Sequence, residues 1–320
     1  MFKYYRPFAI LLVIVSTTLL TAIPSEAQQQ SLENISEKVT VHRFGGAPYD
    51  QVNAYWVETP NGVFIVDTQR LTHQANYLVN EIKRNTSKPV LGILITHFHP
   101  DHTGGLPTLR KAFGKNALIY TSEFTRNDIA TDSTGLLAAR HKSFGRDFPE
   151  PSKFPTPDIA VKDGDELILA GIKVIAKVYK DVDSPSSVVW IMPDKKIAFL
   201  GDLAVDRKTP SLRGGTSSLY LKALDTLSEE LADYKIAYPG HGEPKSPKNL
   251  ILQTMSYIKL VRTLVAEQLS INGKITTSQV DDIKQILLKQ FSFDFDTLLF
   301  PKEHEININA TALELHNLNQ

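Results

Sequence analysis

The sequence contains no cysteine. That absence excludes disulfide bonds, a cysteine nucleophile, thiolate metal ligands and a lipid-modified N-terminal cysteine. Any bound metal ion must therefore be held by histidine and carboxylate side chains. An exported protein of this kind would depend on its hydrophobic core for stability.

The chain also has no excess of charge of one sign, because 35 basic residues balance 35 acidic ones. A neutral chain has no electric field that attracts nucleic acid or an anionic membrane, so we expect a small-molecule substrate and no nucleic acid partner. The 320 residues are 42% hydrophobic, which is enough for a full-sized core. No linker rich in Gly or Ser is present, and we expect one domain over residues 28–320 with a helical extension from about residue 248.

No apolar run is long enough for a typical membrane span, because the longest N-terminal run, residues 8–15, is far short of about 20 residues. Two basic residues precede this run, and small residues stand at Ser25 and Ala27, as at a signal peptidase site. Residues 1–27 are therefore interpreted as a signal peptide cleaved before Gln28, with an uncleaved anchor as the alternative. We expect an exported protein, periplasmic or secreted, without stable membrane association.

The hydrophobic pattern alternates between the periods of strand and helix. Two β-rich runs flank Asn61-Gly62 and predict a hairpin over residues 52–67. Residues 122–158 have no clean period and contain four prolines near their end, so they are interpreted as an insertion over the site. Further strands are expected at residues 90–95, 118–121, 166–169, 172–178, 188–191, 197–200 and 236–238, and helices at residues 75–82, 106–113 and 219–231 and from residue 248 onward. Two β-rich halves with helices predict an α/β fold, an αββα sandwich of two mixed β-sheets flanked by helices.

Four ligand-type residues are concentrated directly after a predicted buried strand: His97, His99, Asp101 and His102. Three crowded imidazoles would repel one another when protonated, whereas a divalent cation binds the neutral rings. In an extended segment the first two histidines project to the same side, and the turn at Pro100 redirects the other two ligands. We therefore expect two ligand sets from one loop. A polar turn without metal is the weaker alternative.

This His-x-His-x-Asp-His segment resembles the signature of the metallo-β-lactamase superfamily. Three further segments resemble the family's other landmarks, in the family's order: Asp67-Thr68, residues 199–203 and residues 238–242. The resemblance implies a dinuclear metal site with two Zn²⁺ ions, in which Asp202 bridges the metals. It also implies that His241 completes the second site with Asp101 and His102. For both Asp202 and His241 the alternative is a simple turn residue after a strand.

One landmark departs from the family's pattern. The family usually has a histidine nineteen residues before the bridging aspartate, and this chain has Asp183 there, while Pro185 and Ser187 keep their places. If Asp183 is a ligand, its charge should favour harder cations such as Mn²⁺ or Fe²⁺ beside Zn²⁺ at the first site. The alternative is that Asp183 only opens the Ser-Pro turn.

The resemblance implies a metal-dependent hydrolase that uses a metal-bound hydroxide to cleave a small carboxylic ester, lactone, thioester or amide. Asp101 is the candidate catalytic residue, orienting or accepting a proton. True β-lactamases of this fold usually have Cys or Ser where Asp202 stands, so the chain resembles glyoxalase-II-like and lactonase-like members more. A β-lactam hydrolase is the first alternative, followed by a phosphodiesterase and a non-catalytic binding protein of the same fold.

The other histidines stand apart from this constellation. His42, His73, His304 and His316 are each isolated among polar residues, and we expect them on the surface. His141 lies in the basic part of the insertion, where a cation over the site could meet a substrate carboxylate. A solvated basic turn is the preferred interpretation of that segment.

Overall fold

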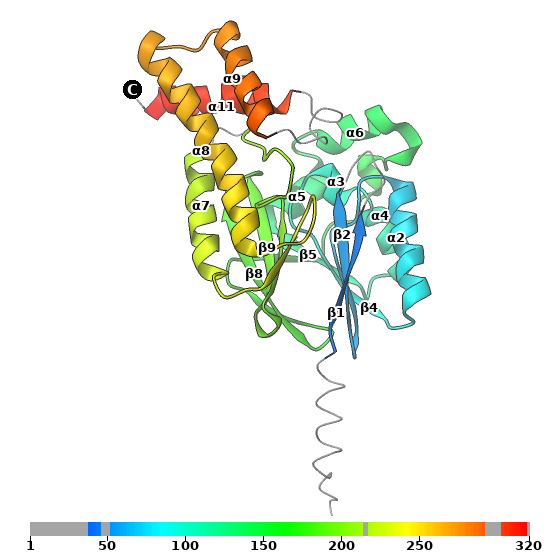
Figure 1. Ribbon diagram of the computed structural model, residues 1–320. Coiled ribbons are helices and arrows are strands. Elements are labelled where there is room, and N and C mark those ends of the chain that lie inside the picture. The colour runs from blue at the N-terminus through cyan, green and yellow to red at the C-terminus, as the bar shows by residue number, and fades with distance from the viewer. Residues whose placement is uncertain (1–37, 46–51, 214–216, 292–301, 319–320) are drawn as a thin grey trace, which may run out of the picture. The chain divides into compact units, whose positions relative to one another are not determined.

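Two β-sheets packed face to face form the centre of the protein (Figure 1). The computed structural model describes residues 38–45, 52–213, 217–291 and 302–318. The residues from Val39 to Gln320 form one compact unit. The proposed signal peptide, residues 1–27, lies outside the described residues.

Both sheets are mixed, as the sequence predicts. The first has the order β1 (Thr40–Gly45), β2 (Asn53–Thr59), β3 (Gly62–Val66), β4 (Val90–Leu94), β5 (Leu118–Ser122) and β6 (Ile159–Val161). Its first three strands are antiparallel neighbours, and β3 to β6 run parallel. The second has the order β11 (Ile236–Pro239), β10 (Ile197–Gly201), β9 (Ser186–Met192), β8 (Ile172–Lys180) and β7 (Glu166–Leu169), with only β10 and β11 parallel.

Alternate strand residues point to different layers of the core, because successive side chains of a strand face opposite sides of its sheet. In β2, Tyr55 and Val57 pack between the two sheets, whereas Ala54 and Trp56 pack against the helices outside. In β9, Trp190 faces the other sheet and Ile191 faces the opposite helical layer. Strands with both faces buried have no polar alternation, and this accounts for their continuous apolar runs.

Helices cover the outer faces of both sheets (Figure 1). On the first sheet lie α2 (Thr72–Asn85), α4 (Leu106–Phe113), α5 (Glu123–Thr131) and α6 (Leu136–Phe144), and on the second lie α7 (Ser217–Glu230) and α8 (Pro247–Asn272). The helices α9 (Thr277–Gln290) and α11 (Glu303–Leu318) pack on α8. The short α3 (Pro100–Thr103) follows β4, and 3₁₀ turns lie at Gly145–Asp147, Pro151–Lys153 and Pro193–Lys195. The described part of the chain has no helix that combines the length and the apolar content needed to cross a membrane.

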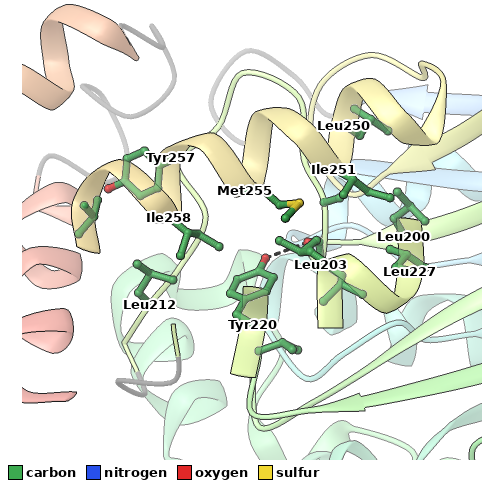
Figure 2. Packing of buried hydrophobic residues seen from close by; sticks show 14 of the residues in the cluster. Leu200, Leu203, Leu212, Tyr220, Leu227, Leu250, Ile251, Met255, Tyr257 and Ile258 are labelled. Carbon is green, nitrogen blue, oxygen red and sulfur yellow. Dashed lines mark hydrogen bonds between the residues drawn. The ribbon is translucent and has the colours of Figure 1, made fainter. Parts of the chain in front are cut away.

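The C-terminal helices are built into the main core. Figure 2 shows Leu250, Met255 and Ile258 of α8 among buried side chains of α7 and of the segment after β10. The hydroxyl of Tyr220 on α7 donates to the carbonyl oxygen of Leu203 at 3.0 Å. The hydroxyl of Ser246 caps α8, and Gly273 ends it in a left-handed conformation.

The insertion is more regular than the sequence suggests, because α5 and α6 lie within residues 122–158. Their apolar stripe is too weak to detect: α6 buries only Leu137, and two of the three buried residues of α5 are polar. The strands β1 and β6 were also not predicted. They lie at the two edges of the first sheet, where few side chains are buried.

Candidate metal centre

The candidate ligands lie where strands of the two sheets end. His97 follows β4, Asp202 follows β10 and His241 follows β11, whereas Asp183 lies just before β9. The carboxyl ends of neighbouring parallel strands meet at one edge of a sheet, which is a common position for sites in open α/β sheets. The sandwich therefore gathers residues that are distant in the sequence.

A first ligand group contains His97, His99 and Asp183. The His97 Nε2 and His99 Nδ1 atoms are 2.8 Å apart, and Asp183 Oδ2 lies 3.8 Å from His97 Nε2. One ligand atom from each residue falls within 4.8 Å of the others. The two histidines point to the same side, as the extended segment predicts. This spacing suits ligands that surround one cation at about 2.0–2.2 Å.

A second ligand group contains Asp101, His102 and His241, whose ligand atoms again lie within 4.8 Å of one another. Asp101 Oδ2 lies 3.2 Å from His241 Nε2 and 3.8 Å from His102 Nε2. The chain turns into α3 at Pro100, and this turn directs Asp101 and His102 away from the first group. One loop thus contributes to two groups, as predicted.

Asp202 lies next to both groups. Its Oδ1 is 3.3 Å from His102 Nε2, and its Oδ2 is 3.5 Å from His241 Nε2. It also forms a third compact group with His97 and His102. This is the position expected of a carboxylate shared by two cations.

Asp67 orients the ring of His102 from the side opposite the ligand groups. Its Oδ2 accepts hydrogen bonds from His102 Nδ1 and from the Thr96 hydroxyl, each at 2.8 Å, and its Oδ1 accepts from the Thr96 amide at 2.9 Å. The bond to Nδ1 leaves His102 Nε2 to face the ligand groups, as is usual behind metal-binding histidines. Asp67 has a φ of 59°, a left-handed conformation that costs energy in most non-glycine residues.

Three glycines allow the surrounding segments to approach closely. A Cβ atom at Gly240 would lie 2.4 Å from Asp202 Oδ1, and one at Gly104 would lie 2.0 Å from the Arg70 carbonyl oxygen. A Cβ atom at Gly105 would likewise lie 2.0 Å from the Thr68 carbonyl oxygen. Gly104 and Gly105 have ordinary helical φ angles, so close packing of the backbone explains these glycines, and no special backbone conformation is needed.

Burial keeps the imidazoles of the first group neutral. It lowers the pKa of His97 well below its ordinary value, with His102 adding to the effect, and it lowers the pKa of His99 to about 4. Burial and the nearby charge of Asp202 raise the pKa of Asp183 to about 7. Neutral rings are the form that binds a cation, and a cation beside Asp183 would favour its anionic form.

Asp101, Asp202 and His102 are held charged by their neighbours, whereas burial lowers the pKa of His241. Burial alone would raise the pKa of Asp101 and of Asp202, but Arg70 beside the first and Lys208 beside the second hold both pKa values well below the usual range. Burial lowers the pKa of His102, yet Asp202 and Asp67 more than offset it, so its pKa is raised. A proton on His102 and a divalent cation both supply positive charge and compete for the same ring nitrogen, so cation binding should release that proton.

Three buried atoms show whether the residues of the site fit a cation. His102 Nε2, Asp183 Oδ2 and Asp202 Oδ1 are buried and make no hydrogen bond to the described residues. Leaving such atoms unsatisfied costs about 1–3 kcal/mol each, and more for a charged group. All three belong to the ligand groups. The donor set therefore fits divalent cations.

A pocket of about 390 Å³ opens beside the ligand groups and is lined by His99, Asp101, Asp183 and Asp202. Leu136 and Arg140 of α6 contribute to its wall, so the predicted insertion does lie over the site.

Two further lining residues were not found by sequence reasoning: Arg70, which lies 3.5 Å from Asp101, and Lys208, whose Nζ donates to Asp202. Neither belongs to a motif, and only proximity in the fold connects them to the site.

Four of the other histidines lie away from the ligand groups. His73 pairs with Asp147 at 2.5 Å, and His316 is exposed, as predicted. His42 is half-buried and stacks on the ring of Trp56. His141 bonds to the Phe148 carbonyl oxygen at 2.8 Å, and its neighbour Arg140 is the residue that lines the pocket.

The surface prediction for His304 is wrong. This residue is 4% exposed, and its Nδ1 lies 3.0 Å from the Tyr257 hydroxyl. Its neighbours differ in burial, because Lys302 is exposed whereas Glu303 is also buried, so the polar composition of this segment does not reveal which side chains face the core.

The fold and the ligand groups agree with the comparison with known families. The model of the metallo-beta-lactamase superfamily matches residues 47–241. The chain belongs to this superfamily. The matched range contains all seven candidate ligands and ends at His241, so α8, α9 and α11 lie beyond it.

Individual members of the superfamily are only distantly similar to this chain. A linear primary-alkylsulfatase from a Pseudomonas species is 24% identical over 229 residues, which are 62% of this chain and 43% of the alkylsulfatase. A hydroxyacylglutathione hydrolase from Shewanella halifaxensis is 41% identical over 71 residues, 21% of this chain and 26% of that protein. The chain thus spans less than half the length of either relative. A metallo-beta-lactamase type 2 from Bacillus cereus is 23% identical over 250 residues, 74% of this chain and 86% of that enzyme.

Solved structures of superfamily members share the fold. A metallo-beta-lactamase family protein from Thermus thermophilus superposes with a TM-score of 0.62 at 19% identity, covering 88% of this chain and 93% of that one. A beta-lactamase domain protein from Burkholderia ambifaria gives a TM-score of 0.63 at 18% identity, with 88% and 86% covered.

Proposed function

We propose that this superfamily member is a metal-dependent hydrolase with two cation sites. The observation that carries the proposal is the convergence of the three overlapping ligand groups with three buried atoms that lack hydrogen bonds. His97, His99 and Asp183 would hold the first cation, and Asp101, His102 and His241 the second. Asp202 would serve both.

Divalent cations bound at these residues would make a water nucleophilic near neutral pH and polarise the bond to be cleaved. We propose Zn²⁺ at both sites, since histidine and carboxylate ligands suit it, with Mn²⁺ or Fe²⁺ as alternatives at the first site. The anionic oxygen of Asp183 supports these harder alternatives. Asp183 Oδ2 accepts no hydrogen bond from the described residues, which supports a ligand over a turn residue.

The protein's own groups prepare this site. Asp67 fixes the ring orientation of His102, and Lys208 holds the carboxylate of Asp202. Asp101 lines the pocket, and its pKa lies well below the usual range because Arg70 and His102 outweigh its burial. We assign Asp101 the role of orienting a reacting group or accepting its proton.

For the bond that is cleaved, a carboxylic ester, lactone, thioester or amide is the leading class. The similarity to hydroxyacylglutathione hydrolase supports it, as does an aspartate, Asp202, where true β-lactamases usually have Cys or Ser. A sulfate ester of a primary alcohol is a second candidate, because the match to the linear primary-alkylsulfatase extends over 62% of this chain. A β-lactam or a phosphodiester ranks below both.

The first test is metal binding. Purified protein should contain about two metal ions per chain, and chelation should abolish hydrolysis. His99→Ala removes one imidazole from the first group and should lower the bound metal, whereas His316→Ala changes an exposed histidine and should leave it unchanged. Full metal occupancy in His99→Ala would contradict the assignment.

The second test is a screen of thioester, lactone, sulfate ester, phosphodiester and cephalosporin substrates with the metal-loaded protein. Hydrolysis that depends on the metal would identify the bond. Two bound metals without turnover of any of these classes would favour a non-catalytic binding protein of the same fold.

A further inference from the structure

Part of the pocket wall beside the first ligand group is apolar. Phe98, Leu136, Val182 and Pro185 line the pocket. Phe98 lies in sequence between two candidate ligands, and the centroid of its ring is 4.8 Å from that of His99. A bound molecule that reaches the ligand groups therefore meets an apolar surface immediately beside them.

Two partly exposed aromatic side chains extend this surface. The ring of Phe124 on α5 packs edge-on against Phe98 at 5.6 Å and is 36% exposed. Phe144, at the end of α6, is 40% exposed, and its ring lies 5.8 Å from the guanidinium carbon of Arg70. Single exposed apolar residues are ordinary on protein surfaces, but aromatic residues that adjoin a pocket are typical of ligand sites.

The position of Leu136 indicates that the apolar wall is separate from the hydrophobic core. It is the first residue of α6, directly after Gly135, whose left-handed φ of 71° starts the helix. Its neighbour Leu137 is the residue of α6 that joins the core, with 1% exposure. The helix thus directs one leucine into the core and the adjacent one into the pocket.

We propose that the substrate carries an apolar group of several carbons, aliphatic or aromatic, next to the hydrolysable bond. This group packs against Phe98 and Leu136 and against the apolar side chains of the segment before β9. The pocket volume of about 390 Å³ lies within the range of sites that bury a small organic molecule. The inference rests on the proposed function for the bond that is cleaved, and it adds the chemical class of the neighbouring group.

Binding of butanoate, hexanoate and octanoate to the zinc-loaded protein, measured by calorimetry below their micelle-forming concentrations, tests this proposal. These carboxylates resemble the product of ester hydrolysis and undergo no reaction themselves. Each added methylene should tighten binding by up to about fourfold while the wall is being covered. The heat-capacity change should become more negative along the series.

Two variants localise the effect. Leu136→Asn should reduce the dependence of affinity on chain length, because it removes apolar surface from the pocket. Leu219→Asn is the matched control: this leucine lies in the first turn of α7, is 51% exposed and does not line the pocket. It should retain the dependence of the parent protein.

Equal affinity for the three carboxylates, or an undiminished dependence in Leu136→Asn, would overturn the proposal. The outcome is separate from that of the substrate screen because binding alone is measured. Binding that depends on chain length, together with no hydrolysis in the screen, would refute the proposed function and keep the apolar site. Hydrolysis in the screen, together with affinities that do not depend on chain length, would support the proposed function and refute the apolar site.

Discussion

Asp183 is the candidate ligand that stands where the resemblance to the superfamily leads us to expect a histidine. Its Oδ1 accepts a hydrogen bond from Ser187 at 2.8 Å, and its Oδ2 remains without one, facing His97. One oxygen is thus fixed by the protein and the other is available to a cation. A histidine at this position would bring a neutral nitrogen ligand in place of a charged oxygen.

We expect Asp183→Ala to lose one cation selectively. The group formed by Asp101, His102 and His241 should keep its metal, while affinity at the first site falls by at least about 10–100-fold. Asp183→His should retain both cations and shift the preference of the first site toward Zn²⁺. Metal analysis after equilibration with limiting Zn²⁺ and Mn²⁺ measures both effects.

Asp181→Asn serves as the control, since Asp181 lines the same pocket but belongs to none of the ligand groups. Two retained metals and an unchanged metal preference in the Asp183→Ala variant would show that Asp183 only supports its turn.

His304 should make the stability of the protein depend on pH. Burial, with Lys284 nearby, lowers its pKa from 6.5 to about 4. Below about pH 6.5 the unfolded chain binds a proton on His304, whereas the folded protein binds it only near pH 4. The contribution of His304 to the free energy of unfolding is therefore present above pH 6.5 and is lost as the pH falls from 6.5 to about 4. Between about pH 7.5 and about pH 5.5 the loss should be about 1 kcal/mol.

His304→Gln should lack this component. Urea unfolding at both pH values, for the parent protein and the variant, gives the difference directly. Equal losses in the two proteins would show that His304 titrates normally.

At the scale of elements, α11 supports a wall of the pocket although it lies beyond the range matched by the superfamily model. Asn307 is fully buried; its side chain accepts from the Leu212 amide at 2.8 Å and donates to the Pro210 carbonyl oxygen at 2.8 Å. Arg213 pairs with Glu303, the first residue of α11. The segment that carries Lys208 and Arg213 therefore takes its shape from the C-terminal helix.

We expect Asn307→Ala to release this segment. Two buried backbone groups would lose their partners, which should lower the free energy of unfolding by about 2–4 kcal/mol. Limited trypsin digestion should cut faster after Lys208 and Arg213, and KM should rise. Asn309→Ala, which changes an exposed residue of the same helix, should behave like the parent. Unchanged digestion in Asn307→Ala would mean that the apolar core alone positions the segment.

At the scale of the whole molecule, we propose that the protein is exported, periplasmic or secreted, and that its mature form begins at Gln28. The apolar run with a basic start and the Ser-Glu-Ala segment motivate this proposal. N-terminal sequencing of protein recovered from an extracytoplasmic fraction should read Gln-Gln-Gln-Ser from residue 28. An intact Met1 in that fraction would contradict it.

The sequence predicts best the parts of the fold whose signal is local. The hairpin of β2 and β3 is confirmed: Pro60 and Asn61 form its two-residue turn, Gly62 begins β3, and side chains on both faces of the two strands are buried. The helix α2 is confirmed because its buried Ala75, Leu78, Val79 and Ile82 repeat at the helical period. Most boundaries differ by only a few residues.

What the sequence by itself determined is the compact set of candidate ligands from His97 to His102, since six consecutive residues cannot move far apart. Only the tertiary structure decided which distant side chains reach them. The strand ends of the second sheet place Asp183, Asp202 and His241 beside them. Ion pairs with Asp202 and Asp101 place Lys208 and Arg70 at the site, and no sequence motif predicts these two residues. The apolar wall on α6 and the support from α11 depend on long-range packing, because the sequence does not distinguish Leu136 or Asn307 from other leucines and asparagines until their neighbours are known.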